Sequence, residues 1–171
     1  GYEMGCTPFM TFLAAYQLLL ARFSGQNEIL TGTPTAGREQ REWQNMQGYF
    51  VNPVVVRTQL EDGSMSFRDL LRQVKETTVG AFVHQAYPFP ALVESLGLAR
   101  DVAHSPVFQN MFVWQKAHAV HPGLTALALG QAGDEIELGA LRFTPLALTQ
   151  QAAQFDLMLA MAEINDDWLA T

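Results

Sequence analysis

The chain has 171 residues, 49% of them hydrophobic and 16% charged, and its formal net charge is −7 at pH 7. This length and composition are those of one globular domain that can bury its own core. No apolar run approaches the ~18 residues of a membrane span, which argues against a transmembrane protein. An acidic chain without a block of Lys or Arg is also poorly suited to binding the phosphate backbone of nucleic acid.

The cysteine content and the two ends suggest a cytoplasmic fragment. Cys6 is the only cysteine, so the chain forms no internal disulfide and no thiolate zinc cluster. The first apolar segment, Phe9 to Phe23, has no basic leader or cleavage site of a secretory signal. The chain opens on Gly1 and closes on NDDWLAT, where residues 165–167 are typical of a turn and Trp168-Leu169 of a strand just begun. We therefore expect a piece of a longer protein.

A long helix is predicted near the start. Thr7 is a good N-cap, Pro8 suits the first helical position, and Gly25 is a good terminator. The apolar residues between them recur at helical spacing: Phe9, Phe12, Leu13, Tyr16, Leu19, Leu20 and Phe23. The width of this stripe predicts burial against a sheet.

Two strands should follow, separated by a polar loop. Glu28–Pro34 is predicted as the first strand and Gly37–Gln47 as the loop. The stretch MQGYFVNPVVVRTQL, residues 46–60, begins like a loop and ends like the second strand, with a turn at residues 61–64. Asn52 precedes the apolar run of this strand. It is either a turn-forming residue or a side chain placed there for binding.

A second long helix is predicted after that turn. Ser66 is its N-cap and Asp69 stands near the capping-box position. Its apolar face consists of Phe67, Leu70, Leu71, Val74, Thr78, Ala81 and Phe82. Pro88 and Pro90 are expected to break the chain before a short helix that ends at Gly97.

The remaining third contains strands and one long loop. Pro106–Gln115 is predicted as a strand, residues 118–133 as a loop, and Glu137–Leu148 and Phe155–Glu163 as two further strands. This order of elements predicts an α/β fold, a mixed β-sheet with helices packed on one or both faces.

No complete catalytic or metal-binding set is visible in the sequence. The histidines are His84, His104, His118 and His121, and they lack the HExxH or CxxC context of a metal site. His118 and His121 could hold a metal if helical, but the Pro-Gly pair that follows favours loop histidines. His84, at a helix end, is favoured there by the helix dipole. We predict no metal ligands and no catalytic residue in this chain.

Three passages together resemble one known family. MQGYFVNPVVVR is similar to the GxFVNT…R segment of nonribosomal peptide synthetase condensation domains. HQAYPFPALVESLGLARD resembles the HQDYPFExLVExL…RD segment, and HSPVFQNMFVWQ the HPLFQVMFxxQ segment. Their order and spacing match, and the flanking segments TPFMTFLAAYQLLLARFSGQNEILTGTPTAGR and FDLMLAMAE also resemble the family. The resemblance extends from about Gly5 to Glu163.

The resemblance implies one lobe of a two-lobe fold of the chloramphenicol-acetyltransferase type. The catalytic HHxxxDG motif of the family belongs to the N-terminal lobe, and no HHxxxDG occurs here. Residues 1–171 are therefore expected to be the C-terminal lobe alone, ending before its last strand and helix. A crossover segment that grips the other lobe should lie between Gln115 and Phe155.

The implied reaction is amide formation in the biosynthesis of a peptide antibiotic. An amine on one carrier protein's phosphopantetheine arm attacks the thioester on another. This lobe would supply a tunnel wall and part of the carrier docking surface, and it would be inactive alone. The expected partners are the N-terminal condensation lobe, peptidyl carrier domains and neighbouring adenylation domains. Phosphopantetheine would arrive on the carriers, so the chain itself binds no cofactor.

The resemblance also implies site residues. Asn52, Gly48 and Tyr49 would face the substrate tunnel, while Arg38 and Arg41 lie on a floor loop or meet phosphate or an acidic carrier helix. The other motif positions are expected to be mostly structural: His84, Gln85, Tyr87, Pro88, Phe89, Arg100, Asp101, Phe108 and Gln109. Arg100-Asp101 could be an ion pair that fixes a loop or a carrier contact.

Departures from the family pattern leave the subtype open. Ala86, Pro90 and Pro53 stand where the family usually has an acidic residue, an acidic residue and threonine. Two rivals share the fold: a carrier- or CoA-dependent O-acyltransferase, and a non-catalytic docking module that recruits a partner enzyme. Because a missing lobe would expose an apolar face and Phe155–Glu163 could be an open sheet edge, we also expect the fragment to self-associate.

Overall fold

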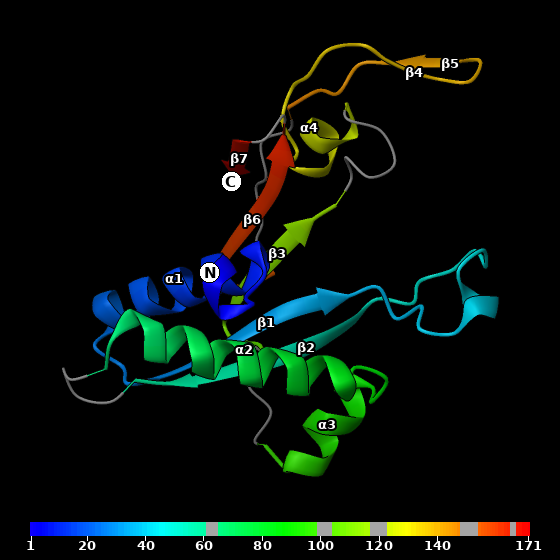
Figure 1. The fold of residues 1–171 in the computed structure, drawn as a ribbon. Coiled ribbons are helices and arrows are strands. Elements are labelled where there is room, and N and C mark those ends of the chain that lie inside the picture. The colour runs from blue at the N-terminus through cyan, green and yellow to red at the C-terminus, as the bar shows by residue number, and fades with distance from the viewer. Residues whose placement is uncertain (61–64, 99–103, 117–122, 148–153, 165–166) are drawn as a thin grey trace. The chain divides into compact units, whose positions relative to one another are not determined.

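The computed structural model describes residues 1–60, 65–98, 104–116, 123–147, 154–164 and 167–171 (Figure 1). The chain divides into two compact units, Gly1–Met111 and Phe112–Thr171. The α/β class is confirmed, because the described residues form both helices and a mixed sheet. The turn predicted at residues 61–64 lies outside the described residues.

The two long helices of the first unit begin and end where the sequence predicts. Helix α1, Pro8–Ser24, is capped by Thr7, whose hydroxyl accepts a hydrogen bond from the Met10 amide, and Gly25 ends it in the left-handed conformation. Helix α2, Phe67–Val83, begins at the Ser66 cap. The Ser66 hydroxyl accepts from the Asp69 amide and donates to the Asp69 carboxylate. This bond, with one from Arg72, lowers the pKa of Asp69.

The sheet of the first unit is mixed. Strand β1, Glu28–Thr35, pairs antiparallel with β2, Asn52–Gln59, from Glu28 opposite Gln59 to Thr35 opposite Asn52. The start of β3, Asn110–Gln115, pairs parallel with β1 at Thr31 and Gly32. The predicted mixed sheet is therefore confirmed. β3 begins four residues later than the sequence suggested.

One face of the β1–β2 hairpin carries both long helices. Alternate residues of a strand share a face, and residues directly opposite one another in the register share it too. The face includes Ile29, Thr31, Thr33 and Thr35 of β1 and Asn52, Val54, Val56 and Thr58 of β2. All of these except Asn52 are buried. Helices α1 and α2 contact each other and this hairpin (Figure 1).

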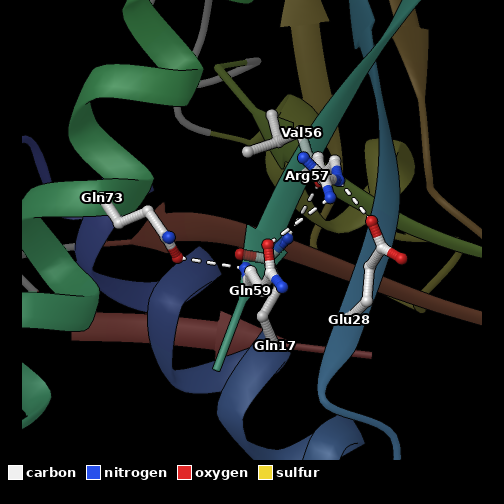
Figure 2. A network of polar contacts seen from close by, with 6 residues as sticks. All are labelled: Gln17, Glu28, Val56, Arg57, Gln59 and Gln73. Atoms are coloured by element: carbon white, nitrogen blue, oxygen red, sulfur yellow. Dashed lines mark hydrogen bonds and ion pairs between the residues drawn. The ribbon is translucent and has the colours of Figure 1, made fainter. Parts of the chain in front are cut away.

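A buried glutamine joins α1 to that face. The Gln17 side chain is fully buried, and its amide donates to the Val56 carbonyl at 3.0 Å and to the Thr31 hydroxyl at 3.3 Å. Its carbonyl accepts from the Thr58 hydroxyl at 2.7 Å. Figure 2 shows Gln17 reaching from α1 to β2. Thr31 and Thr58 thus meet a polar partner from the helix instead of an apolar side chain.

Polar contacts also tie α2 and the outer strand positions together. The side-chain carbonyl of Gln73, on α2, accepts a hydrogen bond from the backbone N–H of Gln59 at 3.1 Å (Figure 2). On the exposed side of the hairpin Arg57 pairs with Glu28 across the strands. Both side chains of this ion pair are more than half exposed, so it contributes little to stability, about 0–1 kcal/mol.

The short helix after α2 differs from the prediction. Helix α3 spans Phe89–Leu96 and ends at Gly97, as expected, but Pro90 lies inside its first turn and does not break the chain. A proline there lacks only an N–H that has no helical partner in any case. Pro88 is the N-cap and offers no side-chain cap.

In its described residues the second unit contains one short helix, most of β3 and four further strands. Helix α4, Leu124–Ala128, lies in a stretch predicted as loop, and that prediction was wrong. The strand predicted over 137–148 is instead a hairpin of β4, Ile136–Leu138, and β5, Leu141–Phe143, because Gly139 adopts a positive φ and turns the chain. The core of this unit is formed by Leu129, Ala160, Ala162, Val113 and Leu169.

The last strands correct the expectation of an open edge. β6, Leu157–Ile164, is hydrogen-bonded to both β3 and β7, Asp167–Ala170. β7 pairs antiparallel along Met161–Ile164, and Trp168 lies 5.1 Å from Trp114 between ring centroids. The predicted strand at Trp168-Leu169 is confirmed. Because β6 is flanked on both sides, self-association through an open β6 edge has no basis. Self-association by an exposed apolar face stays a prediction.

Gln17→Leu tests the buried polar contact. The change keeps the volume but leaves the Val56 carbonyl and two threonine hydroxyls without their partner, which costs about 2–3 kcal/mol. Hydrogen exchange of peptides covering α1, β1 and β2 in the intact protein should therefore become roughly 30- to 150-fold faster. The exposed Gln40→Leu is the matched control and should leave exchange unchanged. Unchanged protection in Gln17→Leu would contradict this account.

Candidate functional site at the loop end of the β1–β2 hairpin

Asn52 is the first residue of β2 and lies opposite Thr35, the last residue of β1. The chain leaves the hairpin here and forms a loop, residues 36–51, before it returns. The Thr35 hydroxyl donates to the Asn52 carbonyl at 2.8 Å and closes the base of this loop. The sequence predicted the strand and the loop, but the role of Thr35 was missed.

The Asn52 side chain binds the backbone of the corner between α2 and α3, residues 84–89. Its Nδ2 donates to the Gln85 carbonyl at 2.9 Å and to the Tyr87 carbonyl at 2.8 Å. Its Oδ1 accepts from the Phe89 amide at 2.9 Å. A primary amide has two donors and one acceptor oxygen with two lone pairs, so one acceptor position remains.

These contacts explain why an asparagine stands at this position. The Phe89 amide belongs to the first residue of α3, whose Pro88 cap has no side-chain acceptor, so Asn52 acts as a cap from another part of the chain. The Gln85 and Tyr87 carbonyls lie just beyond the end of α2 and need donors. A primary amide offers two donors and an acceptor oxygen together, whereas a hydroxyl offers only one donor. Any substrate contact of Asn52 is limited to its remaining lone pair.

Arg38 organises the loop from inside. Its Nη1 donates to the Trp43 carbonyl and, at 2.6 Å, to the Met46 carbonyl. Its Nη2 donates to the Gly48 carbonyl at 3.1 Å. The guanidinium also lies 4.4 Å above the Phe50 ring. The fork of the side chain is therefore occupied by the loop's own backbone, and that favours the floor-loop interpretation of Arg38 over a direct carrier contact.

Aromatic stacking and one glycine complete the loop. Trp43, in the short 3₁₀ turn Arg41–Trp43, stacks on Phe50 with 6.2 Å between centroids. Gly37 has a positive φ of 62°, and a Cβ there would lie 1.8 Å from the Phe50 carbonyl oxygen, so only glycine fits. Trp43, Phe50 and Gly37 were not singled out from the sequence. Their aromatic and glycine character was the available signal, but nothing showed that Arg38 gathers them.

The other residues expected at the tunnel or carrier surface lie on the outside of this loop. The Tyr49 side chain is 88% exposed, and Gly48 accepts from Arg38. Arg41 is exposed, and its guanidinium forms no hydrogen bond or ion pair with the rest of the described chain. Tyr49 and Arg41 are thus free to contact another molecule, whereas Arg38 is not.

Most motif residues of the corner and of the segment after α3 contribute to packing or to local hydrogen bonds. His84 is the C-cap residue of α2, and its backbone amide closes the last turn. Phe108 is 1% exposed and packs on Phe89 at 5.4 Å and against Gly32, where a Cβ would lie 2.3 Å from its ring. Gln109 donates to the Ser105 carbonyl. Arg100, Asp101, His118 and His121 lie outside the described residues.

The chemistry available in the described residues is that of binding and orientation. In the described ranges no three His, Cys, Asp or Glu side chains gather as a metal site would require. Among the same residues, no helix combines the length and apolarity needed to cross a bilayer. The site has amide, guanidinium and aromatic groups on a rigid hairpin end, and the functional groups that it exposes are suited to holding a partner.

The mixed sheet with helices packed on it is an α/β fold. Comparison with solved structures confirms this fold class. The chain superposes on a four-domain nonribosomal peptide synthetase, holo-AB3403, with a TM-score of 0.85 and 26% identity over 97% of this chain and 13% of that one. It also matches the first condensation domain of the CDA synthetase, with a TM-score of 0.66, 16% identity, and 99% of this chain against 34% of that one. These neighbours have the chloramphenicol-acetyltransferase-like fold.

Residues 2–170 match the condensation-domain family, and the chain belongs to that family. It is 42% identical to a linear gramicidin synthase of Brevibacillus parabrevis over 98% of this chain, and 37% identical to bacitracin synthase 3 of Bacillus licheniformis over 96%. The chain spans about 3% of the length of the first relative and 2% of the second. The resemblance drawn from the motifs around Asn52, Tyr87 and Phe108 is therefore confirmed at the level of the family.

Arg38→Lys tests the organisation of the loop. Lysine keeps the charge but loses the fork that bridges three carbonyls, so opening of residues 36–51 should become about 5- to 30-fold easier, or about 1–2 kcal/mol. The measurement is proteolytic cleavage within this loop of the intact protein. Arg41→Lys, three residues away and exposed, is the matched control and should be cleaved at the wild-type rate. Equal cleavage of the two variants would show that Arg38 does not organise the loop.

Proposed function

We propose that this chain is the C-terminal lobe of a condensation domain that joins two carrier-bound substrates through an amide bond. The family match over residues 2–170, in a chain without the HHxxxDG motif, is the observation that carries the proposal. The coverage of about a third of a condensation-domain structure agrees with one lobe of two. The catalytic histidine then belongs to the part of the domain outside these 171 residues.

The reaction forms one bond and breaks one. The acceptor amine nitrogen attacks the thioester carbonyl carbon, the carbon–sulfur bond breaks, and the donor carrier's phosphopantetheine leaves as the thiol after the nitrogen gives up a proton. Holding the two arms in line accounts for much of the rate gain in such a reaction. The histidine outside this chain would position or deprotonate the amine.

The described residues would contribute a wall and a floor to the tunnel. The corner fixed by Asn52 and the loop organised by Arg38 form one rigid end of the hairpin. Gly48 and Tyr49 lie on the outer part of that loop, where they could line the path of a phosphopantetheine arm. The crossover between Gln115 and Phe155 would grip the other lobe, and the chain would bind no cofactor of its own.

Carrier and adenylation domains are the proposed partners. Carrier proteins bring phosphopantetheine, whose phosphate is a natural partner for an exposed guanidinium. Arg41 supplies such a group on the outside of the loop, whereas the guanidinium of Arg38 is occupied by backbone carbonyls. Adenylation domains would load the carriers as neighbours in the same polypeptide.

The central test uses the polypeptide that contains this chain with its natural flanking sequence. Donor and acceptor carriers are loaded with aminoacyl groups, and the acceptor carrier is analysed by intact-protein mass spectrometry. The expected product is a dipeptidyl thioester on the acceptor carrier. A parallel reaction uses an acceptor that presents a hydroxyl in place of the amine. Ester without amide would assign the chain to the O-acyltransferases. Absence of any transfer, with a stable complex to a partner enzyme, would assign it to the docking modules.

Arg41→Ala tests the carrier contact. Loss of one exposed ion pair should raise the KM for the loaded acceptor or donor carrier about two- to fivefold, in line with about 0.5–1 kcal/mol, and leave kcat unchanged. The effect should shrink as salt is added, because the charges are solvent-exposed. Arg22→Ala, at an exposed arginine of α1, is the matched control. If both variants have the wild-type KM at low salt, Arg41 is not a carrier contact.

A further inference from the structure

The Asn52 side chain connects two segments that are far apart in the sequence. Its three hydrogen-bond partners lie 33, 35 and 37 residues further along the chain. All three partners are backbone groups, so the contact does not depend on which side chains the corner carries. The amide therefore fixes the path of the corner and leaves the exposed side chain of Tyr87 available at its surface.

The corner has few other anchors at its centre. Within residues 84–89 the Gln85 amide reaches the Phe82 carbonyl at 3.3 Å and the Tyr87 amide reaches the His84 carbonyl at 3.0 Å. Both bonds are local and hold the turn without placing it against the sheet. Phe89 packs on Phe108 at the far end of the corner. Among the described residues, Asn52 makes the polar contacts that place the corner relative to the hairpin.

The backbone of Asn52 is held in place as well as its side chain. Its backbone pairs with Thr35 and accepts the Thr35 hydroxyl, at the point where the loop 36–51 starts and ends. Gly37 and Phe50 approach each other just beyond this point. The loop and the corner consequently share one anchor, and a shift of Asn52 moves both.

We propose that Asn52 is a positioning residue of the condensation reaction, acting as an amide clamp that holds the α2–α3 corner against the base of the 36–51 loop. It acts through its two N–H donors and its capping oxygen, and the substrate meets the surfaces it aligns. This inference rests on the proposed function, because the reaction supplies its kinetic readout.

Asn52→Asp separates the clamp from a direct substrate contact. Aspartate has the same shape and keeps the acceptor oxygens, but it loses both donors and places a negative charge beside the Gln85 and Tyr87 carbonyls. If Asn52 acts as a clamp, Asn52→Asp loses activity at least as severely as Asn52→Ala does. If Asn52 serves only as a hydrogen-bond acceptor for substrate, the Asn52→Asp variant stays active and the Asn52→Ala variant loses activity.

Two control variants match these changes. Asn110→Ala removes another strand asparagine whose Nδ2 donates to a backbone carbonyl, that of Leu30, at 2.8 Å. It should lower the melting temperature of the domain about as much as Asn52→Ala does, while leaving turnover unchanged. Gln26→Glu makes the same amide-to-carboxylate change at an exposed glutamine beyond the end of α1, outside the loop and the corner, and it should leave both stability and turnover unchanged.

The experiment uses the full-length polypeptide with loaded carriers, and it measures kcat, KM and hydrogen exchange of residues 84–89. Asn52→Ala and Asn52→Asp should each lower kcat/KM about ten- to hundredfold, mostly through kcat, because misplaced groups lose alignment in the transition state. Exchange of the Phe89 amide should rise at least tenfold in Asn52→Ala, and Asn110→Ala should keep the wild-type kcat.

Three results would overturn the clamp: an active Asn52→Asp beside an inactive Asn52→Ala, wild-type kinetics in both, or an equal loss of kcat in Asn110→Ala. The last would mean that Asn52 supports only the general stability of the fold. Failure of the proposed function is distinguishable, because then the wild-type polypeptide itself forms no amide. In that case unchanged exchange of the corner in Asn52→Ala would still refute the clamp, and faster exchange would leave the structural part of it standing.

Discussion

The antiparallel register of β1 against β2 is the constraint on which the candidate site depends. Because Thr35 stands opposite Asn52, the asparagine lies on the same face as Val54 and Val56, which is the face covered by the helices. A shift of one residue would turn Asn52 to the other face and away from the α2–α3 corner. The contacts of Asn52 with the corner are therefore a consequence of how the hairpin pairs.

That register is itself secured by polar contacts in the core. Gln17 bonds to Thr31, Val56 and Thr58, and these partners lie on both strands. A displaced strand would leave the Gln17 amide buried without partners, at a cost of about 1–3 kcal/mol for each unpaired group. An apolar side chain would tolerate such a slip more easily. The buried amide of Gln17 thus favours one register, and the amide of Asn52 makes use of it.

Local rules account for the part of the fold that the sequence predicts well. The caps Thr7 and Ser66 and the terminator Gly25 determined the bounds of α1 and α2, because each acts on its nearest neighbours. The wrong predictions concern short elements: α4 has five residues, and the turn at Gly139 divides a run that is apolar enough to resemble one strand. Pro90 shows the same limit, since a proline marks either a break or a first turn and the sequence alone leaves both open.

The candidate site could be predicted in its residues but not in its connections. The motif resemblance pointed to Asn52, Arg38 and the corner, and each of them takes part in the arrangement. What they bind is long-range: Asn52 reaches backbone 33 to 37 residues away, and backbone groups carry no sequence signal. Arg38 has a charge that suggested phosphate, yet it serves three carbonyls. The function of a polar side chain in this site therefore depends on the donors and acceptors that the fold brings to it.

Pro53, directly after Asn52, restricts the backbone of the asparagine. It stands where the family usually has threonine, and it lacks an N–H, so it cannot donate to the strand ladder. A residue before proline is restricted to extended backbone, which is the conformation Asn52 needs at the start of β2. Because Pro53 lies opposite Pro34 on the edge strand β2, the proline leaves the ladder between β1 and β2 intact, and it narrows the backbone freedom of Asn52 before any partner is bound. An asparagine that must serve three backbone groups at once benefits from that restriction, because less conformational entropy is lost when the corner docks.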